Sequence, residues 1–504
     1  MSKKHIFLLL LAAIGFLFIF SVSTTPLLGY LAYGDSDIFQ IVGMLWEKYG
    51  IIPYQGAWDH KGPVIHLVNA VGYMLTGNRF GVFIIQVVSL WITLIFAYRS
   101  FLLQFNARKT LILTGFFLCA IVLPYERGSN NVEEYCLPFL MASCYYIMRW
   151  SSVAANGEYR HNYKYAFAYG CCLGVCLMTR TTNMLGICGA ITVIFFILLI
   201  KKEWKNVIDN LLAGLIGISV VTVPFGIYFA LKGAFQDFLY GTFVFNFLYA
   251  GKAAIEWETL SFYDIIKLFI SYFNYIGLAL IGFSELIFGK KENKNIGIVW
   301  IAMGIFVGVW LNKSYGFLHY GLLLVPYFAI IVIELKRIST LVRLPGAIYL
   351  KKIIVVYIIF VVLGASIESK YIYVNYYQHM ITGKEDIYVL QKRDLSTMIN
   401  LANKVPDDEM DSFVAYNCYP GLYIAENIVP DCKYFALQDW QSLHSEVLLQ
   451  QIRNDFITCS PKWVLVYECY EPVGIQDVLN DQYVCVDSQV ISSTLLECKL
   501  YCHK

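Results

Sequence analysis

The sequence has little net charge and lacks the local signatures of several large protein classes. Charged residues make up 15% of the 504 positions, and the net charge is +2. Without a basic surface there is no electrostatic case for a nucleic-acid partner. No Gly-rich phosphate loop, no nucleotide-binding motif and no internal repeat is evident. Function must therefore be sought in other patterns.

The cysteines show no CxxC spacing, which argues against a zinc module of the usual kind. Seven of the 14 lie in or beside apolar segments before residue 190, where they are expected to act as small core residues. The other seven lie between Cys418 and Cys502, so at least one thiol there has no partner within the tail. Sequence alone does not assign bridges among them.

Apolar residues are in large excess, and the excess is unevenly distributed. The chain is 58% hydrophobic with a mean hydropathy of +0.58, whereas soluble domains contain about 45–50% apolar residues. Apolar runs of spanning length occur up to about residue 368, and the remainder resembles soluble protein. We predict an all-α polytopic membrane domain over residues 1–368 and a small soluble α/β domain over residues 369–504. Membrane-interface belts account for part of the 16% aromatic content.

The topology follows from segment length and loop charge. Residues 1–22 resemble a signal peptide, but no Ala-x-Ala site follows, so we expect a retained first helix. The apolar stretch Gly62–Thr76 is ambiguous because it is short and contains His66 and Asn69. Counting it as a span would turn the most basic connections outward, against the positive-inside rule. We therefore expect an interfacial helix there. Eleven spans are predicted, at about 6–23, 80–103, 110–125, 133–150, 164–180, 183–200, 207–230, 263–288, 296–312, 319–335 and 353–368.

This parity places the N-terminus in the cytoplasm and the tail outside, in a multi-pass plasma (inner) membrane protein. The outer side then holds segments 24–79, 126–132 and 231–262. Aromatic residues recur in the last of these, which is consistent either with a surface dipping into lipid or with a loop packed on its neighbours. In the tail, Phe413–Cys418, Lys433–Gln438 and Trp463–Cys469 are predicted as strands and Gln441–Arg453 as a helix.

Two acidic residues and one lysine in the first outer segment are the main candidates for chemistry. Asp35 and Asp37 follow the first span directly, where carboxylates are costly unless solvated or used. Each is a candidate general base or metal ligand, and the alternative is an N-cap for a helix over Asp37–Tyr49. Lys61 precedes the interfacial helix and can bind a lipid phosphate; the alternative is a snorkelling lysine.

The first outer segment resembles that of a known enzyme group. An acidic pair after the first span, an amphipathic helix and then Trp58–Pro63 are similar to the dolichyl- or polyprenyl-phosphate-mannose-dependent mannosyltransferases of the GT-C class. Lipid A aminoarabinose transferases and protein O-mannosyltransferases are similar too. Many members have Lys-Pro-Pro where Gly62 follows the lysine here, which affects the local backbone.

Two later motifs extend the resemblance over about residues 1–340. Residues 131–135 resemble the second outer acidic loop of bacterial members. Residues 314–320, followed by Pro326, resemble a late His-Tyr motif that opens a span.

The resemblance implies transfer of a sugar from a polyprenyl phosphate to a hydroxyl of a lipid, glycan or protein acceptor. Asp35 would be the catalytic base, and Lys61, with Arg127 or Arg180, would stabilise the departing phosphate. Membrane lipids are the other expected partners. A divalent cation is possible because oligosaccharyltransferases of this class use one, but Asp35 and Asp37 are too few ligands to define a site. The implied substrate-binding residues are Asp37, Asp59, His60, Lys61, Arg127, Asn131, Glu133, Glu134, Arg180, His319 and Tyr320.

Three other functions are weaker readings of the same sequence. A transporter or lipid-linked glycan flippase would bury ionisable residues near the middle of its spans, whereas the charges here gather at the outer edge. A surface-polysaccharide ligase or polymerase usually has its long outer loop late among the spans. A non-catalytic membrane scaffold would not require the first-loop charges.

Overall fold

The computed structural model describes residues 1–504 except 30–33, 126–128, 251–261, 290, 312–317, 342–345, 444–445 and 471–472. The chain forms two compact units, each built from three segments. The first unit contains Met1–Phe20, Gln86–Ile227 and Ala253–Lys370. The second contains Ser21–Ile85, Tyr228–Lys252 and Tyr371–Lys504. The predicted boundary at residues 368 and 369 thus falls close to Tyr371, but the first loop groups with the tail.

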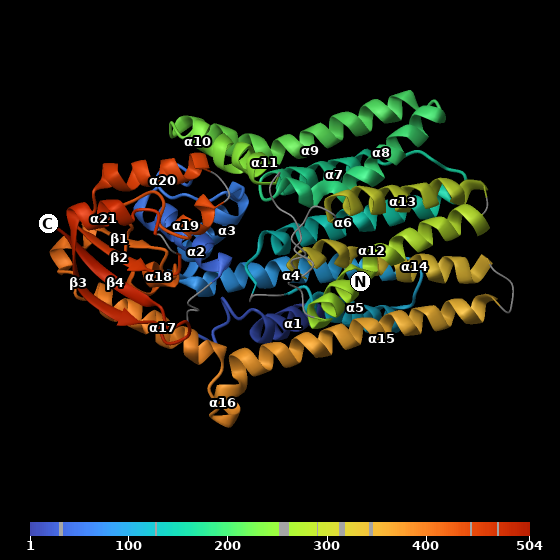
Figure 1. The fold of residues 1–504 in the computed structure, drawn as a ribbon. Coiled ribbons are helices and arrows are strands. Elements are labelled where there is room, and N and C mark those ends of the chain that lie inside the picture. Colours follow the sequence, from blue (N-terminus) through green and yellow to red (C-terminus); the bar gives the residue numbers. More distant parts are fainter. Residues whose placement is uncertain are drawn as a thin grey trace. The chain divides into compact units, whose positions relative to one another are not determined.

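The first unit is all helical, as predicted (Figure 1). Most of α4, at Arg79–Phe101, and of α9, at Trp204–Leu231, belongs to it. The other long helices are α1 (Lys3–Phe20), α5 (Ala107–Val122), α6 (Val132–Ala154), α7 (Tyr163–Leu177), α8 (Leu185–Ile200), α12 (Phe262–Phe288), α13 (Lys291–Leu311), α14 (Val325–Leu341) and α15 (Gly346–Ile372). Short 3-10 turns, η2 (Thr181–Met184) and η5 (Leu318–Leu324), precede α8 and α14.

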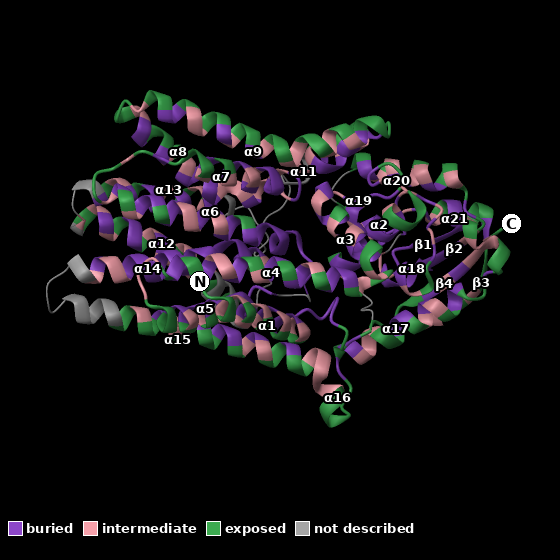
Figure 2. Ribbon diagram, turned by 180° about the vertical axis from the view of Figure 1, so that it is seen from behind, coloured by how far each residue is buried: buried purple, intermediate pink, exposed green. Residues whose placement is uncertain are grey.

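Several of these helices are long and apolar enough to cross a membrane, so the chain is a multi-pass membrane protein. Within the described residues, six helical segments meet both criteria. Each of the eleven predicted spans coincides with one helix, although the number of actual crossings stays a prediction. Burial varies widely among them: α14 is enclosed, whereas α9 and α15 expose much of their surface (Figure 2).

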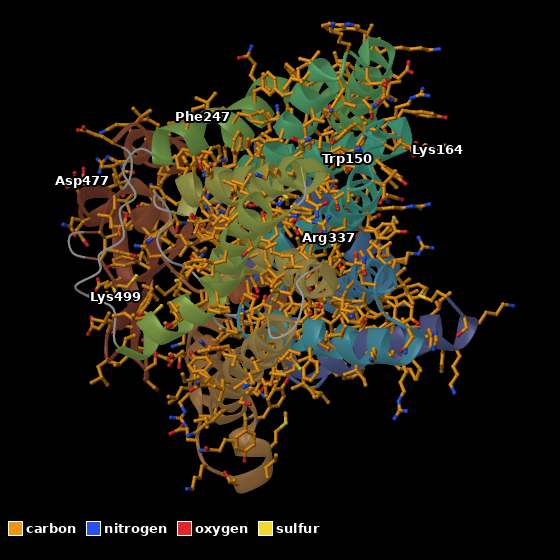
Figure 3. All side chains as sticks on the ribbon, turned by 90° about the vertical axis from the view of Figure 1, so that its right-hand side faces the viewer. Trp150, Lys164, Phe247, Arg337, Asp477 and Lys499 are labelled. Atoms are coloured by element: carbon orange, nitrogen blue, oxygen red, sulfur yellow. The ribbon has the colours of Figure 1, made fainter. Side chains whose placement is uncertain are left out.

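Small residues and one buried ion cluster hold these helices together. A Cβ at Gly170 of α7 would lie 2.1 Å from the carbonyl oxygen of Gly214 on α9, so only glycine permits this approach. Arg337 of α14 (Figure 3) contacts Glu285 at 2.8 Å and Glu334 at 2.6 Å. Both carboxylates are buried, so the arginine neutralises charges that would otherwise be costly at this depth.

The second unit begins with two helices of the first loop. Helix α2 spans Asp35–Tyr49 and α3 spans Pro63–Thr76. They pack closely at Gly43, where a Cβ would lie 2.6 Å from that of Asn69. Asn69 and His66 are fully buried on α3, so the polar residues that made this segment ambiguous are enclosed by protein. At 14 residues α3 is about 21 Å long, short of a hydrocarbon core of about 30 Å.

The tail supplies a four-stranded sheet in the order β1-β2-β4-β3. Strands β1 (Phe413–Tyr416) and β2 (Trp463–Tyr467) are parallel, and β4 (Glu497–His503) is antiparallel to both β2 and β3 (Tyr483–Val490). The predicted α/β class is confirmed, as are the strands starting at Phe413 and Trp463. The remaining elements are η6 (Tyr373–Tyr377), α16 (Gln378–Thr382), α17 (Ile387–Ala402), η7 (Asp407–Ser412), α18 (Gly421–Glu426), α19 (Gln438–Ser442), α20 (Glu446–Cys459) and α21 (Gln476–Gln482).

Two tail predictions were incomplete or wrong. Lys433–Gln438 is not a strand; its buried apolar residues enter the core from an irregular segment, which alternation alone does not distinguish from a strand. The predicted helix Gln441–Arg453 overlaps the end of α19 and the start of α20. Strands β3 and β4 were missed; β3 is largely exposed although most of its residues are apolar.

The first loop and the tail share one hydrophobic core. Ile41 and Leu45 of α2, both fully buried, join a cluster with Leu395 and Met398 of α17 and with residues of β1 and β2. The apolar face of α2 is therefore covered by the tail domain. This shared core fixes where the first-loop motifs lie.

The aromatic segment after α9 packs on its neighbours. It forms α10 (Phe235–Leu239), the π-helical turn η3 (Tyr240–Val244) and α11 (Phe245–Ala250). Phe238 stacks on Phe229 with centroids 4.6 Å apart, and Phe245 is buried; Phe235 and Phe247 are exposed. Phe238 and Phe245 therefore fit the packed loop, and Phe235 and Phe247 fit an exposed aromatic surface.

Candidate functional site

The first-loop cluster consists of Asp35, Asp59, His60, Lys61 and His66. Four of its members lie where an extended segment turns into α3. Pro63 occupies the first turn of that helix, where proline's fixed φ and missing N–H suit the position, and Gly62 is the N-cap in extended conformation. Lys61 thus immediately precedes the start of a helix.

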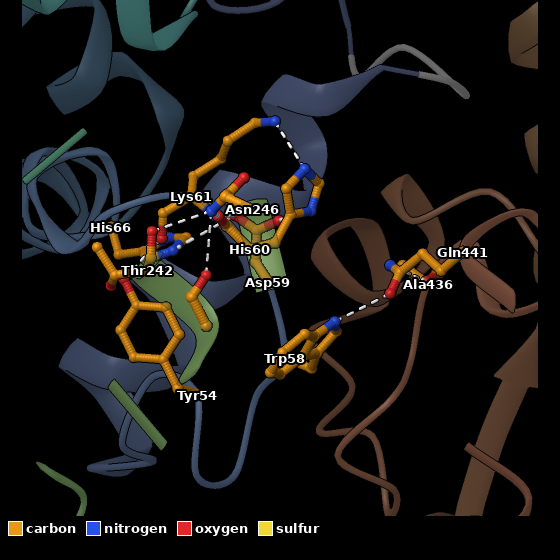
Figure 4. A network of polar contacts seen from close by, with 11 residues as sticks. Tyr54, Trp58, Asp59, His60, Lys61, His66, Thr242, Asn246, Ala436 and Gln441 are labelled. Atoms are coloured by element: carbon orange, nitrogen blue, oxygen red, sulfur yellow. Dashed lines mark hydrogen bonds and ion pairs between the residues drawn. The ribbon is translucent and has the colours of Figure 1, made fainter. Parts of the chain in front are cut away.

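Asp59 organises the cluster (Figure 4). It is buried, and one carboxylate oxygen lies 3.5 Å from Nδ1 of His60 while the other lies 3.4 Å from Nε2 of His66. The Lys61 N–H donates to Asp59 at 3.3 Å. Burial raises the pKa of Asp59 to about 6, and the Lys61 charge opposes that rise. Asp59 therefore lies close to both histidine rings and accepts a hydrogen bond from the backbone of the lysine.

The ammonium of Lys61 lies 2.8 Å from Nε2 of His60. Lysine only donates, so this nitrogen must accept and the His60 proton must sit on Nδ1, the side of Asp59. Burial lowers the pKa of His66 to about 3, so that ring is neutral at pH 7. Lys61 is half-buried.

Two side chains hold the backbone of His60 and Lys61 in place. The Tyr54 hydroxyl donates to the carbonyl of Lys61 at 2.7 Å, and the Asn246 amide of α11 donates to the carbonyl of His60 at 2.6 Å. Tyr54 itself has a positive φ of 69°, an uncommon conformation for a bulky residue. One contact is therefore local, and the other comes from a segment distant in sequence.

The tail also fixes this segment. The Trp58 indole N–H donates to Gln441 of α19 at 2.9 Å (Figure 4), and its ring contacts Tyr240, Phe245 and Tyr434. Trp58 is buried. It acts as the anchor between the motif and the tail domain.

The two aspartates at the start of α2 differ sharply. The helix begins at Asp35, with Gly34 at the N-cap position and no side-chain cap, so the N-cap reading of Asp37 is wrong. Asp35 is exposed, and its charge is close enough to raise the pKa of Asp59. Asp37 is buried, and burial raises its pKa to about 7 against the lowering effect of Arg79. One oxygen of Asp37 has no hydrogen-bond partner within the described residues.

The geometry of these acids does not define a metal site. In the part of the chain that the structure describes, the one group of three close His, Cys, Asp or Glu ligand atoms lies in the tail, at Cys432, Asp455 and Cys459. Asp59 is already engaged by its histidines. We therefore derive no step through a divalent cation.

Four of the remaining candidates lie together in the first unit as an Arg180 cluster: Arg180, Glu133, His319 and Tyr320. Arg180, between α7 and η2, contacts buried Glu133 of α6 at 3.3 Å. Its guanidinium lies 4.1 Å from the ring centroid of Tyr320, and the His319 ring is 4.5 Å from that of Tyr320. Arg180 lies just before η2, Glu133 lies in the first turn of α6, and Tyr320 lies in η5, so three helix starts meet here. The arginine is held by one carboxylate and one aromatic face.

Glu134 and Asn131 have different surroundings. Glu134 is buried, accepts from Gln86 at 3.1 Å and from the Asn130 N–H at 2.9 Å, and bonds Tyr125. Its contacts connect the 129–131 segment to α4. Asn131 is the N-cap residue of α6 without a side-chain cap bond. Arg127 lies outside the described residues.

Three contributors were not foreseen from sequence. His66 and Asn246 complete the first-loop cluster, although neither stands in a recognisable motif. Arg79 donates to the carbonyls of Ser23 at 3.2 Å and Gly29 at 2.7 Å, bracing the chain before α2. The available signal was a lone arginine at a span start, which usually indicates snorkelling.

Comparison with known proteins agrees with this architecture. Residues 60–228, about a third of the chain, match the family described as dolichyl-phosphate-mannose-protein mannosyltransferase. The structure is similar to ArnT from Cupriavidus metallidurans, solved bound to undecaprenyl phosphate, with a TM-score of 0.59 and 12% identity over 99% of this chain and 98% of that one. Archaeal oligosaccharyltransferase AglB from Archaeoglobus fulgidus has a TM-score of 0.49 and 10% identity over 92% of this chain and 69% of that one. No curated protein matches.

The helical membrane unit, the fold match and the family match define a membrane glycosyltransferase of the GT-C class. Within that class, the chain is similar to the dolichyl-phosphate-mannose-protein mannosyltransferases over residues 60–228 and to ArnT in fold.

Proposed function

We propose that this glycosyltransferase takes its sugar from a polyprenyl-phosphate donor and transfers it to a lipid, glycan or protein acceptor on the outer face of the membrane. The supporting observation is Lys61, a half-buried ammonium held at the start of α3 close to the acids of the first loop. A similar fold has been solved with undecaprenyl phosphate bound. A compact lysine charge is suited to a lipid phosphate.

In the proposed reaction, an acceptor hydroxyl attacks the anomeric carbon of the donor. Asp35 takes the hydroxyl proton, the new C–O bond forms with inversion, and the bond to the phosphate oxygen breaks. Polyprenyl phosphate leaves with its added negative charge, which Lys61 stabilises. His60 and Asp59 position the ammonium. For the Arg180 cluster we propose a role in substrate binding.

Turnover of a panel of polyprenyl-phosphate sugars by purified protein in lipid nanodiscs tests this function. Asp35→Asn should lower turnover by about 10²–10⁴-fold, the usual cost of losing a general base, without loss of folding. Lys61→Ala should weaken both donor binding and turnover, since the phosphate is charged before and after transfer. Near-normal turnover by folded Asp35→Asn would refute the base assignment. If Asp37→Asn were inactive instead, the two roles would be exchanged.

The rival function is a transporter or lipid-linked glycan flippase. It predicts movement of a lipid-linked sugar across vesicle membranes without a new glycosidic bond. Proteoliposomes loaded with a fluorescent polyprenyl-phosphate sugar distinguish the two, because transfer changes the mass of the acceptor whereas flipping changes only access to a quencher.

A further inference from the structure

The tail domain contains a pocket of about 410 Å³ that has no part in the proposed reaction. It lies where β1 and β2 end. These strands are neighbours and parallel, so their carboxyl ends meet at one edge of the sheet (Figure 1). Tyr419 follows β1 in the chain, Tyr470 follows β2, and both line the pocket. In open α/β sheets, ligands bind in the crevice beyond the carboxyl ends of the strands.

The backbone at this edge is held in an uncommon conformation. Asn417 and Leu437, which both line the pocket, have positive φ values of 57° and 53°. For leucine this conformation is strained, and such residues cluster at ligand sites.

A buried network maintains the conformation of Asn417. Its side-chain amide donates to Asp439 at 2.7 Å, and its carbonyl oxygen accepts from the Asp439 N–H at 3.0 Å. Its backbone N–H donates to Gln438 at 2.9 Å, and the Tyr416 hydroxyl donates to Asp439 at 2.7 Å. Hydrogen bonds within the tail therefore hold this part of the pocket wall.

The lining indicates the chemistry of the ligand. No lining residue is charged, so a phosphate or carboxylate would lose its water without gaining a counter-charge. Tyr419 and Tyr470 are half-buried and offer ring faces. The Tyr419 hydroxyl bonds the side chains of Ser493 and Tyr467, and the carbonyl oxygen of Gln391 has no hydrogen-bond partner within the described residues. Apolar faces next to hydroxyl and amide groups suit an uncharged ligand that has both an apolar surface and hydrogen-bonding groups.

We propose that this pocket binds a neutral pyranose ring of the acceptor. A pyranose has an apolar C–H face that packs on tyrosine and a rim of hydroxyls that hydrogen-bond to side chains. A plain acyl chain would leave the polar groups unpaired. Assigning the sugar to the acceptor rests on the proposed function, whereas sugar binding at this edge does not.

Saturation-transfer NMR on the full-length protein in nanodiscs tests the proposal. The probes are methyl α-mannoside, methyl β-galactoside and the methyl glycoside of N-acetylglucosamine, with methyl glucuronide as the charged comparison. At least one neutral glycoside should receive saturation at its ring C–H protons, and the glucuronide should receive less. Binding of no neutral glycoside by the unaltered protein would overturn the proposal.

Variants locate the binding. Tyr470→Ala and Tyr419→Ala should each lower the affinity for the glycoside by about tenfold. The phenylalanine variants keep the ring and should lose less affinity. Tyr163→Ala is the matched control, because Tyr163 is an exposed tyrosine of α7 outside the pocket. If an alanine variant does not fold, the corresponding phenylalanine variant and the other tyrosine carry the test. Unchanged binding in the folded pocket variants would refute the assignment.

The same samples separate this proposal from the proposed function. Polyprenyl phosphate binding should survive in Tyr470→Ala and weaken in Lys61→Ala. Glycoside binding should weaken in Tyr470→Ala and survive in Lys61→Ala. Glycoside binding at the pocket without transfer from any lipid-linked donor would refute the proposed function and retain the sugar site. If folded Tyr470→Ala bound neither the glycoside nor polyprenyl phosphate, the two ligands would not have separate sites.

Discussion

At the scale of single residues, the two aspartates of the first loop show how burial changes a carboxyl group. Asp35 and Asp37 are two positions apart, yet one is exposed and the other is enclosed. Because burial raises the pKa of Asp37 to about 7, folding favours its protonated form. That contribution to stability is complete below the ordinary pKa of 3.8 and is lost as the pH rises through about 7.

We therefore predict that Asp37→Asn raises the apparent melting temperature at pH 8 by at least about 2–4 °C. The gain should shrink at pH 5, where the wild-type carboxyl is protonated in the folded state. Thermal unfolding in detergent at both pH values measures this, with Asp35→Asn as the control that should show no such pH-dependent gain. An equal gain at both pH values would contradict the argument.

His60 provides a second residue-scale prediction. Its ring accepts from the Lys61 ammonium at 2.8 Å, which requires a neutral ring. His60→Ala should therefore leave Lys61 in place but less restrained, and weaken polyprenyl phosphate binding less than Lys61→Ala does. His60→Gln, which keeps an acceptor, should recover part of the loss. Titration of the purified variants with polyprenyl phosphate provides the measurement, and a His60 loss larger than the Lys61 loss would be incompatible with a positioning role.

At the scale of elements, α3 shows that the sequence predicted a helix but not the contacts that the helix makes. Its length and its polar residues predicted a helix over about Gly62–Thr76 that does not span, and the observed helix Pro63–Thr76 buries His66 and Asn69 within its own unit. The same periodicity could not show that His66 faces Asp59, since they belong to a turn and a helix whose packing depends on the tail. Local signals predicted elements; the contacts between distant elements required the structure.

The tail shows the same division. Buried strands β1 and β2 were found because apolar residues run through them. Exposed β3 was missed, and 433–438 was assigned as a strand, because a short apolar run indicates burial and not backbone conformation. At the candidate site, Asp35, Asp59 and Lys61 were predicted from one motif, whereas Asn246 reaches His60 from nearly 190 residues away.

The interfacial position of α3 remains to be tested. A reporter fused after residue 78 should be found outside, and one fused after residue 106 should be found in the cytoplasm, if α3 lies flat and α4 crosses. Protease protection or a dual phosphatase–galactosidase reporter gives the answer. A cytoplasmic signal at residue 78 would rule out the predicted topology.

The proposed outside location of the tail has a covalent consequence. The sulfur atoms of Cys432 and Cys459 lie within 4.8 Å of each other and of Asp455. Protein disulfide oxidants outside the cytoplasm should remove two electrons and two protons from this pair, closing a loop that stabilises the tail by about 3 kcal/mol. Peptide mapping without reductant should find the cross-linked pair, and Cys485, which is exposed, serves as the comparison. Two reduced thiols retaining zinc would point to a metal site instead.

At the scale of the whole molecule, the shared core makes the first loop depend on the tail domain. Ile41 and Leu45 of α2 lie in one hydrophobic cluster with Leu395 and Met398 of α17, and α18 of the tail packs on α2. Deleting residues 385–504 would expose this apolar surface, at a cost of roughly 25 cal/mol per Å². We expect the truncated protein to lose the native first loop and, with it, polyprenyl phosphate binding. Limited proteolysis between residues 35 and 76 reports the loop directly; a protected loop in the truncated protein would show that α2 and α3 fold without the tail.

Because one core draws on both ends of the chain, synthesis imposes an order on activity. The ribosome releases α2 early, but α17 emerges roughly 350 residues later, a delay on the order of tens of seconds at ordinary elongation rates. During that interval α2 can pack on α3, but the part of its apolar face that joins the tail core lacks that partner. A nascent chain can therefore have its first helices inserted while its first loop still lacks the packing that the tail provides.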